Sequence, residues 1–183
     1  MTRLANRTER GTSVKYNETK RLPNRDSKDG IIPLSPAIRV RMLSGLQYRE
    51  VVLRSVASAC RFVTRRPDNP GWSEFRSDVV TAVSEAFNNI VLHGYNGRSD
   101  GIIELEIRTR PNHISVKLRD FGTSFDLNAI PPPRLDELPE SGLGVYIMRE
   151  LMEVKYRPGH PNVLTLSKDF YPANGVAMVE GDA

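Results

Sequence analysis

The stretch SEAFNNIVLHGY, residues 84–95, places several polar side chains within an apolar helical pattern. At 100° per residue, one edge of this helix carries Glu85, Asn88, Asn89, Leu92 and His93. Apolar residues occupy most of the remaining surface, which indicates a buried helix. A polar edge that simply meets solvent is the ordinary explanation, but it is weak here because asparagine is a poor helix former and two stand in mid-helix. The edge is therefore a candidate ligand site.

The residue types on this edge suit a metal ion and a proton acceptor. Carboxamide and carboxylate oxygens are hard ligands, and proteins commonly hold Mg²⁺ through one or two of them together with phosphate oxygens. A glutamate one helical turn away could accept a proton from an attacking hydroxyl group or water.

A second motif, DFGTSFD at residues 120–126, follows an alternating apolar pattern that predicts a strand. An aspartate at the end of a strand can accept a hydrogen bond from a ligand amino group, and a glycine beside it lets a flat ring approach the backbone. Taken alone, the motif is better explained as a strand-to-loop turn. The letters DFG do not indicate a protein kinase of the usual fold, because the chain has no VAIK-type lysine and no HRD-type loop.

A third motif, SGLGVYIMREL, begins at residue 141. Gly142 and Gly144 open a predicted helix, whose free N–H groups and positive dipole end suit an anion such as phosphate. The motif is neither a Walker loop nor a dinucleotide fingerprint, since no Gly-Lys-Ser/Thr follows and a third glycine is missing. Taken alone, it is better explained as a loop that enters a helix.

The composition limits the class of protein. The chain has 183 residues, 39% of them hydrophobic and 26% charged, which predicts one globular domain with some excess length. No apolar run is long enough to span a membrane and no signal peptide is recognisable, so we expect a cytoplasmic protein that does not bind membranes. The only cysteine, Cys60, excludes an internal disulfide and a cysteine-based metal cluster, and its apolar neighbours predict a buried thiol.

The net charge of +4 is confined to one end of the chain. Residues 1–36 contain 8 Lys and Arg and 4 Asp and Glu, interspersed with proline, glycine and polar residues. This pattern predicts a disordered basic tail rather than a direct nucleic-acid contact. We expect a folded domain over residues 37–170 and a C-terminal extension over 171–183.

Hydrophobic periodicity and turn residues predict the elements of the domain. We expect strands at residues 37–43, 101–109, 113–119, 154–157 and 162–167, and helices at 47–64, 73–94 and 142–152. This order predicts an α+β two-layer sandwich, in which helices cover one face of a mixed, largely antiparallel sheet.

The order and spacing of the three motifs resemble the nucleotide-binding boxes of the GHKL (histidine-kinase-like) ATPase superfamily, which has the Bergerat-type ATP-binding fold. The resemblance rests on Glu85-x-x-x-Asn89-x-x-x-His93, on Asp120-x-Gly122 and on Gly142-Leu-Gly144. Within that superfamily, the stretches SEAFNNIVLHGY, SGLGVYIMRELMEVKY and the final strand that begins at Asn162 resemble the anti-sigma-factor serine/threonine kinases. These bacterial proteins sequester a sigma factor and phosphorylate an anti-anti-sigma partner. The resemblance covers about residues 37–170.

The resemblance implies ATP and Mg²⁺ as cofactors and assigns a role to each motif. Glu85 would activate the hydroxyl group of the incoming serine or threonine, and Asn89 would bind Mg²⁺. The residues implied to bind the nucleotide are Asn88 or His93 at the phosphates, Asp120 and Gly122 at adenine, and Gly142, Leu143 and Gly144 around the phosphates.

Two features of this assignment stay open. Ser124 stands where the family often has a second glycine, which leaves the geometry of the adenine loop less certain. The family also uses an arginine of the first helix to contact the partner or nucleotide, and both Arg49 and Arg54 are candidates.

Three functions compete. The first is an ATP-dependent serine/threonine kinase that is also an anti-sigma factor; its partners would be an anti-anti-sigma protein and a sigma factor, and a homodimer is compatible with it. The second is a nucleotide-gated protein-binding switch without kinase activity, which has no need for a base at Glu85. The third is the ATP-binding domain of a sensor histidine kinase, which needs an upstream phosphoacceptor histidine, whereas the three histidines His93, His113 and His160 all lie at or after the nucleotide helix.

Overall fold

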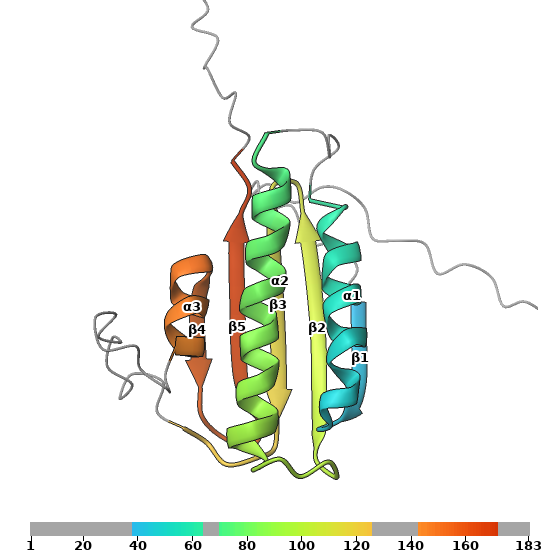
Figure 1. The fold of residues 1–183 in the computed structure, drawn as a ribbon, viewed down its shortest axis with the longest axis vertical. Coiled ribbons are helices and arrows are strands. Elements are labelled where there is room, and N and C mark those ends of the chain that lie inside the picture. The colour runs from blue at the N-terminus through green and yellow to red at the C-terminus, as the bar shows by residue number, and fades with distance from the viewer. Residues whose placement is uncertain (1–37, 64–69, 126–142, 172–183) are drawn as a thin grey trace, which may run out of the picture. The chain divides into compact units, whose positions relative to one another are not determined.

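One five-stranded antiparallel sheet and three helices make up the part of the chain that the computed structural model describes, residues 38–63, 70–125 and 143–171 (Figure 1). The strands lie in the order β1-β2-β3-β5-β4. Their bounds are Ile38–Leu43 for β1, Ile102–Arg110 for β2, His113–Asp120 for β3, Glu153–Arg157 for β4 and Asn162–Asp169 for β5. The two-layer α+β sandwich with helices on one face is confirmed.

The sheet is antiparallel throughout the described strands rather than mixed. Two helices connect β1 to β2, so the chain returns to the end it left and β2 runs against β1. In the described part of the chain, one helix lies between β3 and β4. These two strands are parallel, but β5 lies between them and pairs with both. β3 and β4 therefore run parallel without being hydrogen-bonded to each other.

The helices form one layer over the sheet, with α2 in the middle (Figure 1). A short 3₁₀ turn at Leu46–Tyr48 leads into α1, Arg49–Cys60, and α2 runs from Trp72 to Asn89. A π-helical turn, Ile90–Gly94, continues α2, and α3 spans Leu143–Leu151. None of the described helices is long and apolar enough to cross a membrane.

The core lies between the sheet and α2. Alternate residues of β3 point toward the helices, so Ile114, Val116 and Leu118 are fully buried, while Phe87 and Ile90 fill the facing side of the α2 segment. The same alternation carries Asp120 onto the buried face, where the apolar pattern of β3 ends. The strand register thus places a carboxylate at the edge of the core.

An aromatic cluster closes the core at the beginning of α2. Trp72 stacks on Phe75 with ring centroids 5.6 Å apart, and Phe170 packs against both rings. Near this end, Lys168 Nζ lies 2.7 Å from Asp78 Oδ2 and donates to the carbonyl of Leu151 at 2.8 Å. The lysine therefore joins β5 to α2 and to the end of α3.

Cys60 is fully buried, as its neighbours predict. Burial raises the pKa of its thiol to about 12, so the neutral thiol is the stable form at physiological pH.

Candidate functional site

The polar edge of α2 is half-buried at Glu85, Asn88 and Asn89. The π-helical turn begins directly after Asn89, and its wider winding moves Leu92 and His93 out of the register that a continuous α-helix would give them. Both of these side chains are exposed. The structure therefore groups Glu85, Asn88 and Asn89, and gives His93 no hydrogen bond to another described residue.

The first turn of α3 lies against this edge. A methyl group added at Gly144 would stand 2.9 Å from Oε2 of Glu85 and 3.4 Å from Oδ1 of Asn89. Two motifs that are separated by more than 50 residues in the sequence thus come together at one place. Leu143 is exposed beside them, and Gly142 lies outside the described residues.

Asn89 carries a buried side-chain nitrogen, Nδ2, without a hydrogen-bond partner in the described part of the chain. A buried donor without a partner costs about 1–3 kcal/mol, so such groups usually belong to a network that a ligand or water completes. An amide N–H fits an anionic oxygen such as that of a phosphate, and the amide oxygen fits a hard cation. The described residues contain no group of three or more His, Cys, Asp or Glu that could hold a metal ion by itself.

Asp120 lies at the centre of a second polar cluster. Its side chain is buried, and its Oδ1 accepts hydrogen bonds from the backbone N–H of Gly122 at 3.0 Å and from Nδ2 of Asn162 at 2.9 Å. Burial raises the pKa of Asp120, and the two hydrogen bonds offset only part of that effect. Oδ2 has no partner among the described residues, which leaves it able to accept a bond from a ligand amino group.

Asn162 organises this cluster, and the sequence interpretation gave it no role in the site. The register pairs Asn162 with Asp120 across β3 and β5. Its side chain is fully buried; Nδ2 also donates to the carbonyl of Gly122 at 3.1 Å, and Oδ1 accepts from Ser124 Oγ at 2.5 Å and from the N–H of Gly159 at 3.1 Å. An asparagine at the first position of a strand, directly before Val163 and Leu164, was the available signal.

Gly94 and Gly122 bring two backbones into contact. A methyl group at Gly122 would overlap the carbonyl group of Gly94, and the N–H of Thr123 donates to that carbonyl at 2.8 Å. We expected Gly122 to admit a flat ring. The approach of the Gly94 backbone is by itself sufficient reason for a glycine at this position.

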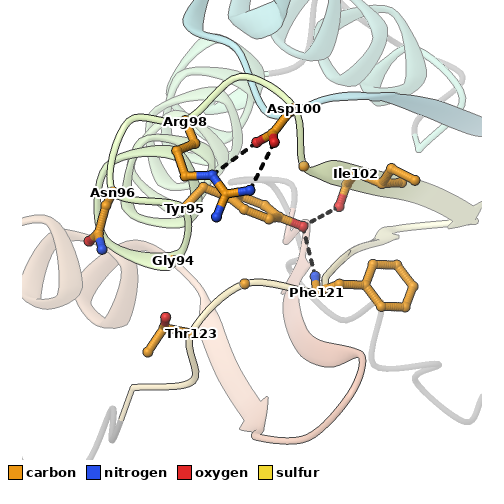
Figure 2. Close-up of a pocket in the computed structure, with 10 residues that line it drawn as sticks. Gly94, Tyr95, Asn96, Arg98, Asp100, Ile102, Phe121 and Thr123 are labelled. Atoms are coloured by element: carbon orange, nitrogen blue, oxygen red, sulfur yellow. Dashed lines mark hydrogen bonds and ion pairs between the residues drawn. The ribbon is translucent and has the colours of Figure 1, made fainter.

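Tyr95 fixes the same region from the other side (Figure 2). Its hydroxyl group donates to the carbonyl of Ile102 at 2.6 Å and accepts from the N–H of Phe121 at 2.8 Å. One side chain thus joins the end of the α2 segment to the start of β2 and the end of β3. This role of Tyr95 is not predictable from the sequence, because both of its partners are backbone groups, which leave no side-chain pattern.

A pocket of about 540 Å³ adjoins this cluster, lined by residues 94–96, 98, 100–102 and 121–123 (Figure 2). Its rim carries the ion pair of Arg98 and Asp100, whose Nη2 and Oδ2 atoms are 2.8 Å apart. Gly94 and Gly122 form the wall nearest Asp120. The lining combines polar groups with the apolar side chains of Ile102 and Phe121.

The model of the protein family described as "Histidine kinase-like ATPase domain" matches residues 50–168, which is more than half of the chain. The chain belongs to this family. The three sequence motifs all lie within the matched residues. The names of the relatives confirm the resemblance to the anti-sigma-factor kinases.

Those relatives carry two kinds of name. The "Anti-sigma F factor" of Clostridium botulinum (strain Alaska E43 / Type E3) is 35% identical over 81 residues, which are 42% of this chain and 57% of that protein. The "Anti-sigma F factor" of Clostridium beijerinckii is 32% identical over 101 residues, 51% of this chain and 71% of that protein. The "Serine-protein kinase RsbW" of Oceanobacillus iheyensis is 33% identical over 100 residues, 50% of this chain and 63% of that protein. The chain thus spans somewhat more than half of the first of these relatives.

Among solved structures, the histidine kinase domain of the blue-light activated histidine kinase from Erythrobacter litoralis EL346 is similar. The TM-score is 0.42 at 18% sequence identity, covering 66% of this chain and 60% of that chain.

Within this histidine kinase-like ATPase domain, the two candidate arginines of α1 differ in position. Arg49 donates to the hydroxyl group of the buried Ser84, through Nε at 3.1 Å and Nη2 at 2.5 Å. Arg54 instead pairs with Glu50 on the exposed side of α1. Arg49 is therefore the arginine that reaches the site helix, one residue before Glu85.

Proposed function

We propose that this chain is an ATP-binding anti-sigma factor and a serine/threonine protein kinase. The observation that carries the proposal is the position of Gly144 against both Glu85 and Asn89, because a helix start that suits a phosphate lies there beside a carboxylate and a carboxamide. The names of the relatives, an anti-sigma factor and a serine-protein kinase, support the same conclusion.

The residues present fit ATP and Mg²⁺. Asp120 would accept a hydrogen bond from the adenine amino group through its free oxygen, with Gly122 beside it. The buried amide of Asn89 would meet phosphate and Mg²⁺, Asn88 or His93 would reach the phosphates, and the N–H groups of Gly142, Leu143 and Gly144 would surround them. Mg²⁺ held by Asn89 would supply positive charge that neutralises the phosphates.

Glu85 would do the protein's share of the chemistry. Its carboxylate would orient the hydroxyl group of an incoming serine or threonine and take its proton. The hydroxyl oxygen would then bond to the γ-phosphorus of ATP while the bond from that phosphorus to ADP breaks and ADP leaves. We propose an anti-anti-sigma protein as the phosphoacceptor and a sigma factor as the sequestered partner, in the cytoplasm, with a homodimer as a compatible assembly. In this proposal residues 37–170 are the ATPase domain, and 1–36 and 171–183 are extensions.

The first prediction separates metal binding from catalysis. Asn89→Ala should weaken the binding of Mg·ATP, because the amide that meets phosphate and metal is removed. Glu85→Gln keeps size and hydrogen bonding but removes the base, so ATP should still bind while phosphate transfer slows by roughly 10²–10⁴-fold. The measurements are ATP affinity by calorimetry and transfer of labelled phosphate to candidate anti-anti-sigma proteins.

Each variant serves as the control for the other. Equal transfer rates for the wild type and Glu85→Gln would show that Glu85 is not the base. If the wild type binds ATP and a partner protein but transfers no phosphate to any cognate partner, the protein is a nucleotide-gated switch.

A further inference from the structure

The sheet has a face that none of the described helices covers (Figure 1). We call it the open face; it consists of the alternate strand residues that point away from the core. The register brings these positions into rows across the sheet, for example Arg39 opposite Glu106 and Glu106 opposite Lys117. Most positions of the open face are polar, which is common for an antiparallel sheet with one solvated side, and the apolar ones are Leu43, Ile102 and Val163.

Five basic side chains on this face share two carboxylates. Glu106, whose side chain is 5% exposed, lies 2.8 Å from Nε of Arg39, 2.7 Å from Nε of Arg108 and 3.9 Å from Nζ of Lys117. These cations lower the pKa of Glu106 to about 2, with Arg108 contributing most. The carboxylate is thus permanently ionised at physiological pH and cannot balance three positive charges.

The second carboxylate is held more loosely. Glu104 lies 3.7 Å from Nε of Arg41 and 4.0 Å from Nη1 of Arg119. At these distances neither arginine is committed to a close hydrogen bond, so both can turn to another acceptor. Arg39 and Arg41 have side chains that are 67% exposed.

The edge strand β4 extends the positive surface. Lys155, with a side chain 73% exposed, pairs with Glu153, and Arg157 follows two residues later on the same side of the strand. Basic residues therefore outnumber acidic ones on the open face of the described strands. The basic residues are Arg39, Arg41, Arg108, Arg110, Lys117, Arg119, Lys155 and Arg157, and the acidic ones are Glu104, Glu106, Glu153 and Asp169.

The charge pattern of the open face favours some binding partners over others. A second copy of the chain, placed face to face, would set one positive surface against another, which disfavours association. Nucleic acid is disfavoured because the open-face positions of the described strands carry no Phe, Tyr or Trp for stacking, and a five-stranded sheet is too broad for a groove of duplex DNA. Two of the acidic residues of the open face, Glu104 and Glu153, would repel the phosphates of a nucleic acid. The same two carboxylates can accept hydrogen bonds from the few lysines of a mainly acidic protein.

We propose that the open face is a docking surface for an acidic protein surface. Arginine and lysine side chains at regular strand spacing would pair with its carboxylates, and the interaction would weaken as salt screens the charges. This inference goes beyond the proposed kinase activity and does not depend on ATP.

The test uses the full-length chain and a fluorescent poly-L-glutamate peptide at low salt, with binding followed by anisotropy. The variant Arg41→Gln/Arg119→Gln removes two cations with only distant partners. The matched control, Arg61→Gln/Arg76→Gln, removes the same charge from exposed positions of the helical layer and keeps the same tail. We expect the first variant to bind the peptide about three- to tenfold more weakly than the wild type, at the usual strength of exposed ion pairs, and the control to bind like the wild type.

Several outcomes would overturn the proposal. They are absence of peptide binding by the wild type, equal weakening in both variants, tighter binding of a labelled DNA duplex than of the peptide, and loss of self-association in the open-face variant alone. Circular dichroism checks the fold of both proteins. If the first variant does not fold, Lys155→Gln/Arg157→Gln on the edge strand makes the same test, with the same expected loss.

Discussion

Asp120 is a buried carboxylate without a basic partner among the described residues. Its two hydrogen bonds come from neutral donors, and burial raises its pKa above the ordinary value of 3.8. An acid whose pKa is raised by folding contributes stability below its ordinary pKa, and this contribution is lost as the pH rises through the raised value. Above the raised pKa the ionised carboxylate therefore costs stability, which is consistent with the ligand role proposed for Asp120.

The second prediction follows from this cost. Asp120→Asn keeps an oxygen for Gly122 and Asn162 but removes the buried charge, so the melting temperature at pH 7.5 should equal or exceed that of the wild type. The advantage should shrink as the pH falls through the raised pKa of Asp120, because the wild-type carboxyl group then becomes neutral as well. ATP affinity should fall by about 1–3 kcal/mol, because the new amide presents a donor to the adenine amino group.

Differential scanning calorimetry across pH and isothermal titration with ATP measure the two effects separately. A clear loss of stability in the variant would show that the charge of Asp120 stabilises the fold. Unchanged ATP affinity would remove Asp120 from the adenine site.

The third prediction concerns Glu106, whose pKa is shifted in the opposite direction to that of Asp120. Its pKa is lowered from 4.5 to about 2, so it contributes stability above pH 4.5 that is lost as the pH falls toward 2. Glu106→Gln should lower the free energy of unfolding at pH 7 by about 1–3 kcal/mol, since charge-assisted hydrogen bonds to Arg39 and Arg108 become weaker. Urea unfolding of the wild type and of Glu106→Gln at pH 7 and pH 3 measures this loss. If the difference in free energy of unfolding between the two proteins is the same at both pH values, it does not arise from the charge of Glu106.

At the scale of elements, the two glycines of the backbone contact are not equivalent. A methyl group at Gly122 would overlap the carbonyl of Gly94, whereas one at Gly94 would have only ordinary contacts, the nearest at 3.6 Å to Oδ1 of Asp120. The overlap involves backbone on both sides, so the end of β3 would have to move away from the π-helical turn.

The fourth prediction compares these positions directly. Gly122→Ala should lower the free energy of unfolding by about 1–3 kcal/mol, the usual cost of overpacking, and should weaken ATP binding because the backbone next to Asp120 shifts. Gly94→Ala is the matched control and should change stability far less. Urea unfolding and ATP titration of both variants test the asymmetry, and equal losses would contradict the contact geometry.

Local pattern predicted most elements, because each depends on neighbours in sequence. The strand at residues 113–119, the helix at 73–94 and the final hairpin all appear near their expected positions. The π-helical turn was not predictable from a period of 3.6 residues. The roles of Tyr95 and Asn162 were missed because they arise from the pairing of strands that the sequence does not order.

The candidate site also divides into features that depend on neighbours in sequence, which were predictable, and features that depend on tertiary packing, which were not. Spacing alone placed Glu85 and Asn89 on one helical edge, and the structure confirms that they share it. Their meeting with Gly144 depends on how α3 packs on α2, and the motif resemblance supplied that link before any geometry did.

At the scale of the whole molecule, the fifth prediction concerns the basic N-terminal residues. Residues 1–36 lie outside the described part, and their composition predicts that they cannot offset an ordering cost of about 1–2 kcal/mol per residue. Deleting them should leave the melting temperature and ATP affinity nearly unchanged. A truncation before Asn162 is the contrasting control, because it removes β5 from between β3 and β4 and should unfold the domain. A drop of many degrees in the first deletion would show that residues 1–36 pack on the domain.

Trp72 gives the molecule a built-in optical reporter. It is the only tryptophan in the chain, and it sits against Phe75 and Phe170 at the opposite end of α2 from Asn89. At about 1.5 Å per helical residue, the indole is on the order of 25 Å from the polar edge. We therefore expect its emission to respond to the detachment of Phe170 and the exposure of the core, and to change little when a nucleotide binds at the proposed site near Asn89. Intrinsic fluorescence should therefore separate unfolding from binding at the proposed nucleotide site without any added dye.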